Sequence, residues 1–477
     1  MVQAGLIAEP VLKQTSSVLL SGILWTIVIC LGNIGPIRRQ ATFFSWRTTE
    51  RSLLALFLLL MASLLWRTWN VPQGFDWEAH VHMVREIRWF AAPSPLFTHF
   101  YDYHPPLSFL LARIPYVLGM PEAASVQMLS AISCLTVFMG LRASLQLLGL
   151  LQYPAAVLFL YGIVASPLYI FLATSINMES LVLGLGSLTL YLSLRLSKTK
   201  VTRRVTRATT IIIGLTTVVL LAAFLTKFNG VLLAVLPPLC ALLFSSRTNR
   251  RMVLLITTCC VVAAAVLAFP YYYGRYYAPL GTFLPSNTNV YDASHQADAR
   301  NKRDADPTRF VLAMFSLPPT HQERLSNRDL DMPRLADTWQ DFWVRDTWLG
   351  AQEGAARIIS TFYVYMAAAG CLLGLLLLPL LSKRNNWTRL GILFLFLGCL
   401  HLFLLAFYCF KNPWGGALPN KGIYLAPLLW SISFLLSMPF AVVDRVAAFR
   451  AFTAWIHTTG LVILVTLLCV NYIVPIY

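Results

Sequence analysis

The sequence predicts an all-α polytopic membrane protein with about 12 transmembrane helices, within a range of 10 to 13. Hydrophobic residues make up 57% of the 477 positions and charged residues only 12%, about half the charged share of a soluble domain. Runs of about 20 apolar residues, long enough to cross a hydrocarbon core of roughly 30 Å, recur along the whole chain. The basic residues fall between these runs. Together these observations favour one helical membrane body over several soluble domains.

The candidate spans follow one another with short basic connections between them. They lie near residues 17–35, 52–67, 123–141, 154–172, 178–195, 209–227, 229–245, 252–272, 358–381, 388–409, 421–439 and 453–475. The first is expected to be a retained helix, because no small-residue cleavage pattern follows it. All nine cysteines lie in apolar stretches, so no disulfide framework is expected.

The formal net charge of +17 is concentrated in the short connections. The connection between residues 195 and 207 holds six Lys and Arg side chains and no acid. Short connections rich in these residues are normally cytoplasmic, so the charge predicts topology, with some attraction to anionic lipid heads. It argues against a nucleic-acid partner, because no basic face is large enough to follow a phosphate backbone.

Placing the basic connections in the cytoplasm divides the chain into five parts. They are residues 1–66 with the N-terminal membrane helices, 67–122 as a first extracytoplasmic loop, 123–272 with the central helices, 273–357 as a second large extracytoplasmic loop, and 358–477 with the C-terminal helices. Segment 107–119 is apolar but short, and counting it as a span would reverse every later connection. We therefore expect it to be interfacial or re-entrant.

The densest group of ionisable residues follows the second candidate span. Asp76, Glu78, His80 and His82 lie within seven positions, and a helix would place Asp76 and His80 on one face. A partly desolvated carboxylate at a membrane boundary can serve as a general base. The alternatives are a solvated helix start capped by Asp76, and a weaker metal site built from Asp76, His80 or His82.

Further ionisable residues lie at the same predicted side of the membrane. His104 precedes a double proline that restricts it to extended backbone at the interface. The others stand at the ends of candidate spans: Glu179, Lys227, Arg275 and Lys421, with Tyr424 close by. Each alone could snorkel to the interface or belong to an aromatic belt. Their convergence on one membrane face instead indicates a site where a phosphate-bearing lipid meets a polar acceptor.

The order of these motifs resembles the GT-C class of membrane glycosyltransferases, especially the branch similar to protein mannosyltransferases and aminoarabinose transferases. The resemblance covers roughly residues 52 to 440. It rests on the acidic motif Asp76 to His80, the His-Pro-Pro-Leu segment His104 to Leu107, the acid in Asn177 to Glu179, the Thr-Lys-Phe-Asn-Gly turn Thr226 to Gly230, and the long second loop.

The resemblance implies an inverting sugar transfer from a dolichyl or undecaprenyl phosphate carrier. Asp76 matches the first-loop acid that such families use as the catalytic residue, and Glu78 is offset by one position from the commoner adjacent Asp-Glu pair. Glu179 falls where the family often has Asp, and Lys421 where relatives often carry Arg. The implied substrate-binding residues are His80, His104, Glu179, Lys227, Arg275, Lys421 and Tyr424.

The implied partners are the lipid-linked sugar donor, membrane lipids and an acceptor that is a protein, a lipid or a glycan. The motifs require no cofactor, and they are compatible with a reaction that uses a divalent cation. The implied site faces the extracytoplasmic or lumenal side of a plasma, inner or endoplasmic reticulum membrane. The competing interpretation is a multi-pass transporter or lipid flippase, which predicts ionisable residues in the middle of the spans.

Overall fold

A computed structural model provides the structure of the chain. It describes residues 54, 58, 62, 65, 69–71, 77–87, 104–164, 166–199, 206–283, 304, 306–308, 368–380, 386–411 and 426–443. Within these residues the chain is mostly helical and contains no β-strand, which agrees with the predicted all-α class.

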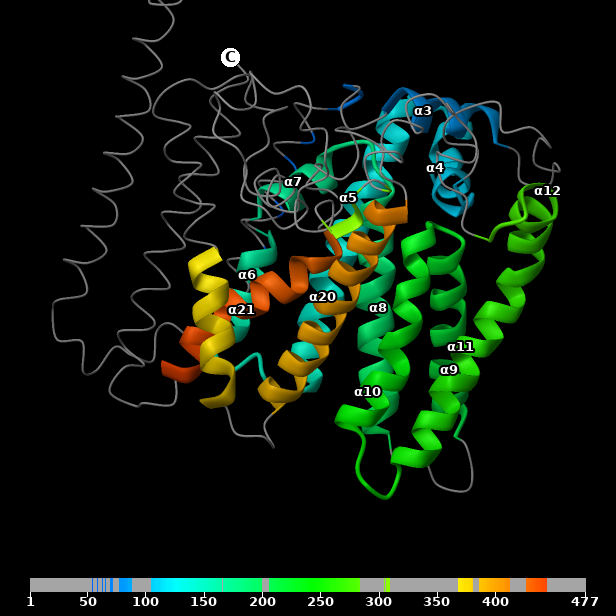
Figure 1. The fold of residues 1–477 in the computed structure, drawn as a ribbon. Helices are drawn as coiled ribbons and strands as arrows, with labels where there is room; N and C mark the ends of the chain where they lie inside the picture. The colour runs from blue at the N-terminus through cyan, green and yellow to red at the C-terminus, as the bar shows by residue number, and fades with distance from the viewer. Residues whose placement is uncertain are drawn as a thin grey trace, which may run out of the picture.

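The helices follow in the order drawn in Figure 1. They are α3 (Trp77–Glu86), α4 (Leu107–Val117), α5 (Glu122–Leu147), α6 (Pro154–Val164), α7 (Pro167–Thr174), α8 (Glu179–Lys198), α9 (Arg207–Phe224), η1 (Phe228–Val235), α10 (Leu236–Phe244), α11 (Arg250–Tyr272), η2 (Tyr273–Tyr277), α12 (Ala278–Leu280), η3 (Leu378–Leu380), α20 (Asn386–Lys411) and α21 (Leu429–Val443).

Five of the described helices are long and apolar enough to cross a membrane. They are Glu122–Leu147, Glu179–Lys198, Arg207–Phe224, Arg250–Tyr277 and Asn386–Phe407. α9 and α11 bury only a third or less of their apolar length inside the protein. The rest of their surface is therefore apolar and outward-facing, as a lipid-exposed helix requires.

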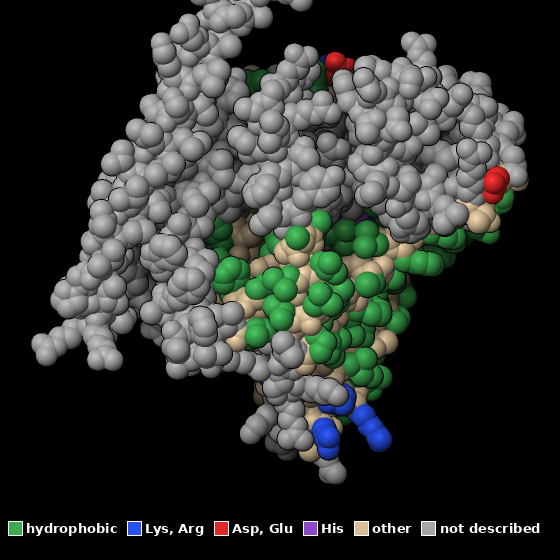
Figure 2. All heavy atoms as spheres, turned by 60° about the vertical axis from the view of Figure 1, so that its left-hand side comes forward, with side chains coloured by type: hydrophobic (Ala, Val, Ile, Leu, Met, Phe, Trp, Pro, Cys, Tyr) green, Lys and Arg blue, Asp and Glu red, His purple; other side chains and the backbone are tan. Residues whose placement is uncertain are grey.

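Charge separates the two ends of this helical body. α8 ends with Arg195 and Lys198, and α11 begins with Arg250 and Arg251. Most of the basic side chains visible in Figure 2 lie at the lower end, the acidic ones lie higher, and apolar side chains form the band between them. We call the lower end the basic end and the opposite end, where α3, α4 and α12 lie in Figure 1, the far end.

The packing of α5 against α8 forms the centre of the body. A Cβ atom added at Gly140 of α5 would lie 2.6 Å from the Ser187 Oγ, and one added at Gly184 of α8 would lie 3.0 Å from the Ser133 carbonyl oxygen. The Ser187 hydroxyl also donates to the Thr136 carbonyl oxygen at 3.1 Å. Small residues allow this close approach, as is typical of helix pairs within membranes.

Two predicted spans are interrupted. The stretch expected to be one helix over residues 154–172 is divided into α6 and α7, because Pro167 has no backbone N–H and begins a new helix. The first part of the span expected over 229–245 belongs to the 3₁₀ helix η1 (residues 228–235), and α10 follows it. The short apolar segment near residues 107–119 forms α4, whose 11 residues rise only about 17 Å, too little to cross the membrane.

The α5–α8 contact predicts that Gly140→Ala will lower the free energy of unfolding by roughly 1–3 kcal/mol, because the added methyl group overlaps Ser187. The measurement is denaturant titration of the purified protein in detergent. Gly214→Ala is the matched control: it also lies within a helix, α9, and its Cβ would meet no atom within 4 Å. Equal stability of the two variants would contradict this account of the packing.

Candidate functional site

A buried ion pair between Glu179 and Lys227 lies at the far end. The Lys227 ammonium donates to the Glu179 carboxylate, and their side chains are only 15% and 9% exposed. Glu179 is the first residue of α8. The Asn177 side-chain oxygen accepts a hydrogen bond from the Ser180 backbone N–H at 3.0 Å, so Asn177 satisfies an amide at the start of this helix. Glu179 is thereby placed in the first turn, where a carboxylate is favoured.

Lys227 is positioned by the tight turn between α9 and η1. The Thr226 hydroxyl donates to the Ala222 carbonyl oxygen at 2.7 Å, and the Gly230 backbone N–H donates to the Lys227 carbonyl oxygen at 2.9 Å. A Cβ atom at Gly230 would overlap the Ala223 carbonyl, so η1 can approach α9 this closely only with glycine at that position. This explains physically why the Thr-Lys-Phe-Asn-Gly sequence forms the turn.

His104 is held beside this turn. The backbone N–H of Leu107, at the start of α4, donates to the Leu225 carbonyl oxygen at 2.9 Å and ties the two segments together. The His104 ring lies 6.2 Å from the Phe228 ring. Burial, together with the charges of Lys227 and His80, holds the pKa of His104 well below its ordinary value. The His104 imidazole is therefore neutral at pH 7.

His80 completes the cluster from α3. Its side chain is buried, and its ring lies 5.7 Å from the Phe109 ring of α4. His80 interacts electrostatically with both His104 and Glu179. The motif is helical over Trp77–Glu86, and this helix presents Glu78 and Glu86 to solvent while burying His80.

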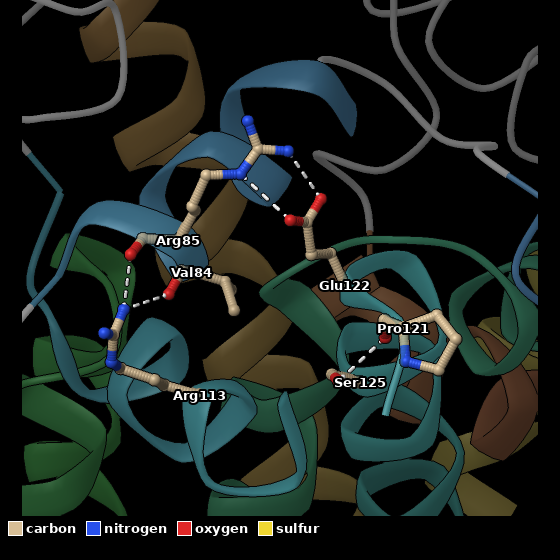
Figure 3. Close-up of polar contacts among 6 residues, drawn as sticks. All are labelled: Val84, Arg85, Arg113, Pro121, Glu122 and Ser125. Carbon is tan, nitrogen blue, oxygen red and sulfur yellow. Dashed lines mark hydrogen bonds and ion pairs between the residues drawn. The ribbon is translucent and has the colours of Figure 1, made fainter. Parts of the chain in front are cut away.

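Two arginines fix α3 in place, as Figure 3 shows. Arg85 forms a bidentate pair with Glu122 at the start of α5, at 2.9 and 2.7 Å. Arg113 of α4 donates to the carbonyl oxygens of Val84 and Arg85 at 2.8 and 2.5 Å, which satisfies the end of α3. Because α3 is anchored to both neighbours, His80 is directed toward the interior of the cluster.

Aromatic side chains form a wall beside the Lys227 turn. The Phe228 ring lies 6.1 Å from the ring of Tyr272 and 5.3 Å from that of Tyr276, and the Tyr272 hydroxyl donates to the Phe224 carbonyl oxygen at 2.7 Å. Arg275 is buried in the same segment and interacts electrostatically with Tyr276.

Arg275 lies in a helical turn at the start of the region 273–357, which was expected to be a large extracytoplasmic loop. The helical path continues from α11 through the π-helical turn η2 to Leu280. Aromatic contacts explain this extension, because Tyr276 of η2 packs against Phe228 and stabilises the turn. Short π-helical turns are frequent at functional sites.

The structure thus brings together four of the predicted residues and leaves others apart. His80, His104, Glu179 and Lys227 form one cluster, which we call the far-end cluster. Glu78 is on the solvent-exposed side of α3, and Arg275 lies in the neighbouring aromatic segment. Three further predicted residues lie outside the described part of the chain: Asp76, Lys421 and Tyr424.

The far-end cluster combines a cation, a carboxylate and a neutral imidazole in a desolvated setting. A buried ionic group at the end of a membrane helix is costly unless it is paired or used. Lys227 can bind an anion, and His104 can accept a proton or a hydrogen bond. Within the described residues, no group of three or more His, Cys, Asp and Glu side chains is arranged to hold a metal ion.

Sequence reasoning missed the aromatic wall. Its signal is the run Tyr271–Tyr273 followed by Tyr276 and Tyr277, which places tyrosines four residues apart on successive helical turns. It also missed the Arg85–Glu122 pair, whose partners are 37 positions apart, with no local pattern to join them.

In comparisons with known proteins, no protein-family model, no curated protein and no solved structure matches this chain.

The buried ion pair predicts a large difference between single and double variants. Lys227→Met should lower the free energy of unfolding by about 3–5 kcal/mol, because it leaves the Glu179 carboxylate buried without its counter-charge. Adding Glu179→Gln should restore most of that loss. Denaturant titration in detergent measures both variants, and Arg85→Ala, which breaks an exposed pair, should have a smaller effect than the single Lys227 variant. A double variant as unstable as Lys227→Met would contradict the pairing.

The lowered pKa of His104 predicts a dependence of stability on pH. The unfolded chain takes up a proton near the ordinary histidine value of about 6.5, whereas the folded chain does so only at lower pH, so stability falls as pH drops below about 6.5. Thermal unfolding at pH 7.5 and 5.5 should show a smaller acid-induced loss in His104→Gln than in the wild type. His82→Gln controls for the removal of a histidine, and identical losses in wild type and His104→Gln would refute the assignment.

Proposed function

We propose that the chain is an inverting glycosyltransferase that moves a sugar from a polyprenyl phosphate carrier to an acceptor on the extracytoplasmic or lumenal side of a membrane. The proposal includes a multi-pass body of about 12 helices with a GT-C-like topology. The five apolar helices and the separation of charge between the two ends are compatible with such a body.

The observation that carries the proposal is the far-end cluster. Its members come from four short motifs spread between residues 80 and 227, and each motif belongs to the set that resembles the GT-C class. They converge in a buried setting beside the start of α8. The convergence supports a shared chemical task more strongly than four unrelated interfacial side chains would.

The cations of the site would bind the phosphate of the lipid-linked sugar donor. The apolar chain of the carrier dissolves between helices, and its phosphate reaches the helix ends. Lys227, Arg275 or Lys421 would then neutralise the phosphate as the sugar–oxygen bond breaks. Because Lys227 is held by Glu179 in the structure, an arriving phosphate would compete with that carboxylate for the ammonium group.

The carboxylates and histidines would activate the acceptor hydroxyl and orient the reacting groups. An acceptor hydroxyl oxygen attacks the anomeric carbon from the face opposite the phosphate. Its proton passes to Asp76, which precedes α3 directly in the sequence, and the electron pair of the broken bond leaves on the phosphate oxygen. Glu78 would orient sugar hydroxyls, and the neutral imidazole of His104 would accept a hydrogen bond from the sugar or position the base.

One observation favours the alternative of a transporter or lipid flippase. His401 is buried near the middle of α20, and an ionisable side chain within a span is a candidate for a solute or proton path. The other acids and bases of the five long apolar helices lie toward the helix ends. An enzyme explains the pairing of Glu179, Lys227 and His104 at one end better than a path across the membrane does.

The proposal predicts that purified protein in proteoliposomes will transfer sugar from a radiolabelled polyprenyl phosphate sugar, and that Asp76→Asn will lose at least about 100-fold in rate, as expected for a general base. The assay uses a panel of donor sugars and acceptors and follows radiolabel in the product. Donor binding is measured in parallel and should be retained by the variant. Glu86→Gln, at an exposed acid of α3, is the matched control and should keep wild-type activity.

Equal rates for the wild type and Asp76→Asn would refute Asp76 as the base and direct attention to Glu78 or Glu179. Absence of both donor binding and transfer across the panel, together with solute flux in the same proteoliposomes, would refute the glycosyltransferase in favour of a transporter.

A further inference from the structure

A ladder of exposed aromatic rings continues the outward face of α11 beyond the apolar span. The Phe269 and Tyr273 rings stack at 5.7 Å, the Tyr273 and Tyr277 rings at 5.7 Å, and the Tyr277 and Phe283 rings at 4.5 Å. The four side chains are 38–53% exposed. We call these four residues the aromatic ladder. They are joined by successive helical turns and by the bend at Gly281, whose backbone is left-handed.

The opposite side of the same segment is buried. Tyr272, Arg275 and Tyr276 are each at most 9% exposed, and the rings of Tyr272 and Tyr276 contact Phe228 of the Lys227 turn. The segment therefore has two faces with different surroundings. One face packs against the turn that carries Lys227, whereas the other exposes the stacked rings at the protein surface.

The ladder is continuous with an exposed apolar face of α11, the kind of surface that a lipid bilayer covers. Leu255, Val262 and Val266 on α11 are more than half exposed, and this helix is long and apolar enough to cross a membrane. A soluble protein rarely exposes so extended an apolar surface. Toward the far end this face changes from aliphatic residues to Phe269 and then to tyrosines, whose hydroxyl groups suit a polar boundary.

The spacing along the helix matches the thickness of a bilayer. Arg251 marks the basic end of α11 and Tyr273 follows 22 positions later, in the π-helical turn that continues α11. At 1.5 Å per residue this distance is about 33 Å, against a hydrocarbon core of roughly 30 Å. When the arginine lies among lipid head groups on one side, the tyrosines lie at the other boundary, where aromatic residues are enriched.

We infer that the aromatic ladder is a membrane-interface anchor, and that its partner is the head-group and glycerol region of the bilayer leaflet at the far end. The anchor sets the depth of the segment it belongs to. Because Arg275 lies on the other face of the same turn, the anchor holds this buried cation at the level of the lipid phosphates. The inference depends on α11 spanning a membrane and not on the proposed sugar transfer.

Photo-crosslinking in phospholipid nanodiscs tests the inference. The photoreactive residue p-benzoylphenylalanine replaces Tyr273 or Tyr277 in the full-length chain, and mass spectrometry identifies the adducts formed on irradiation. The expected product is a phospholipid adduct attached near the glycerol esters. The same residue in place of Val262, on the exposed middle of α11, should instead attach toward the ends of the acyl chains and shows that the reaction reaches lipid.

Phospholipid adducts from position 262 with none from positions 273 and 277 would overturn the anchor, since the ladder would then be covered by protein. Preferential capture of an isoprenoid lipid at 273 and 277 would also overturn it, because the ladder would then be a docking face for a carrier tail. Absence of lipid adducts at all three positions would overturn the premise that α11 crosses the bilayer. None of these outcomes depends on glycosyltransferase activity.

Discussion

The close packing of α5 against α8 determines where the site can form. Glycine and serine at the contact allow the two backbones to approach, and α5 also holds the chain that leads into α8. The Gln127 side chain donates to the Thr174 carbonyl oxygen at 3.2 Å, and the Ser130 hydroxyl donates to the Asn177 carbonyl oxygen at 3.4 Å. These bonds place the first turn of α8, and with it Glu179. A helix pair that looks purely structural therefore controls the position of the buried carboxylate.

The two ion pairs at the far end differ in what surrounds them. Arg85 and Glu122 meet at the surface, where water and salt weaken their attraction, and their pairing mainly orients α3. Glu179 and Lys227 are largely removed from solvent, so each makes the burial of the other tolerable. The exposed Arg85–Glu122 pair therefore orients a helix, whereas in the buried Glu179–Lys227 pair each charge needs the other as its counter-charge.

The sequence predicted the all-α class and named all four residues of the far-end cluster, because local patterns mark them. Apolar run length reveals helices such as α5 and α8, and an ionisable residue at the end of an apolar run is conspicuous, as Glu179 and Lys227 are. What it could not supply depends on contacts between distant segments. The 3₁₀ helix η1 before α10 packs closely on α9 at Gly230, and the extension of α11 past residue 272 follows from aromatic contacts in η2. The break at Pro167 has a local cause, the proline itself, which the length of an apolar run does not reveal.

The separation of Glu179 from Lys227 along the chain has a consequence for biogenesis. During synthesis α8 emerges before α9 and the turn that carries Lys227. Until that turn is synthesised, the nascent chain carries the Glu179 carboxylate without its counter-charge. An unpaired carboxylate at the end of a membrane helix is energetically costly. A chain truncated between α8 and η1 would therefore hold the Glu179 carboxylate at a helix end with no Lys227 to neutralise it.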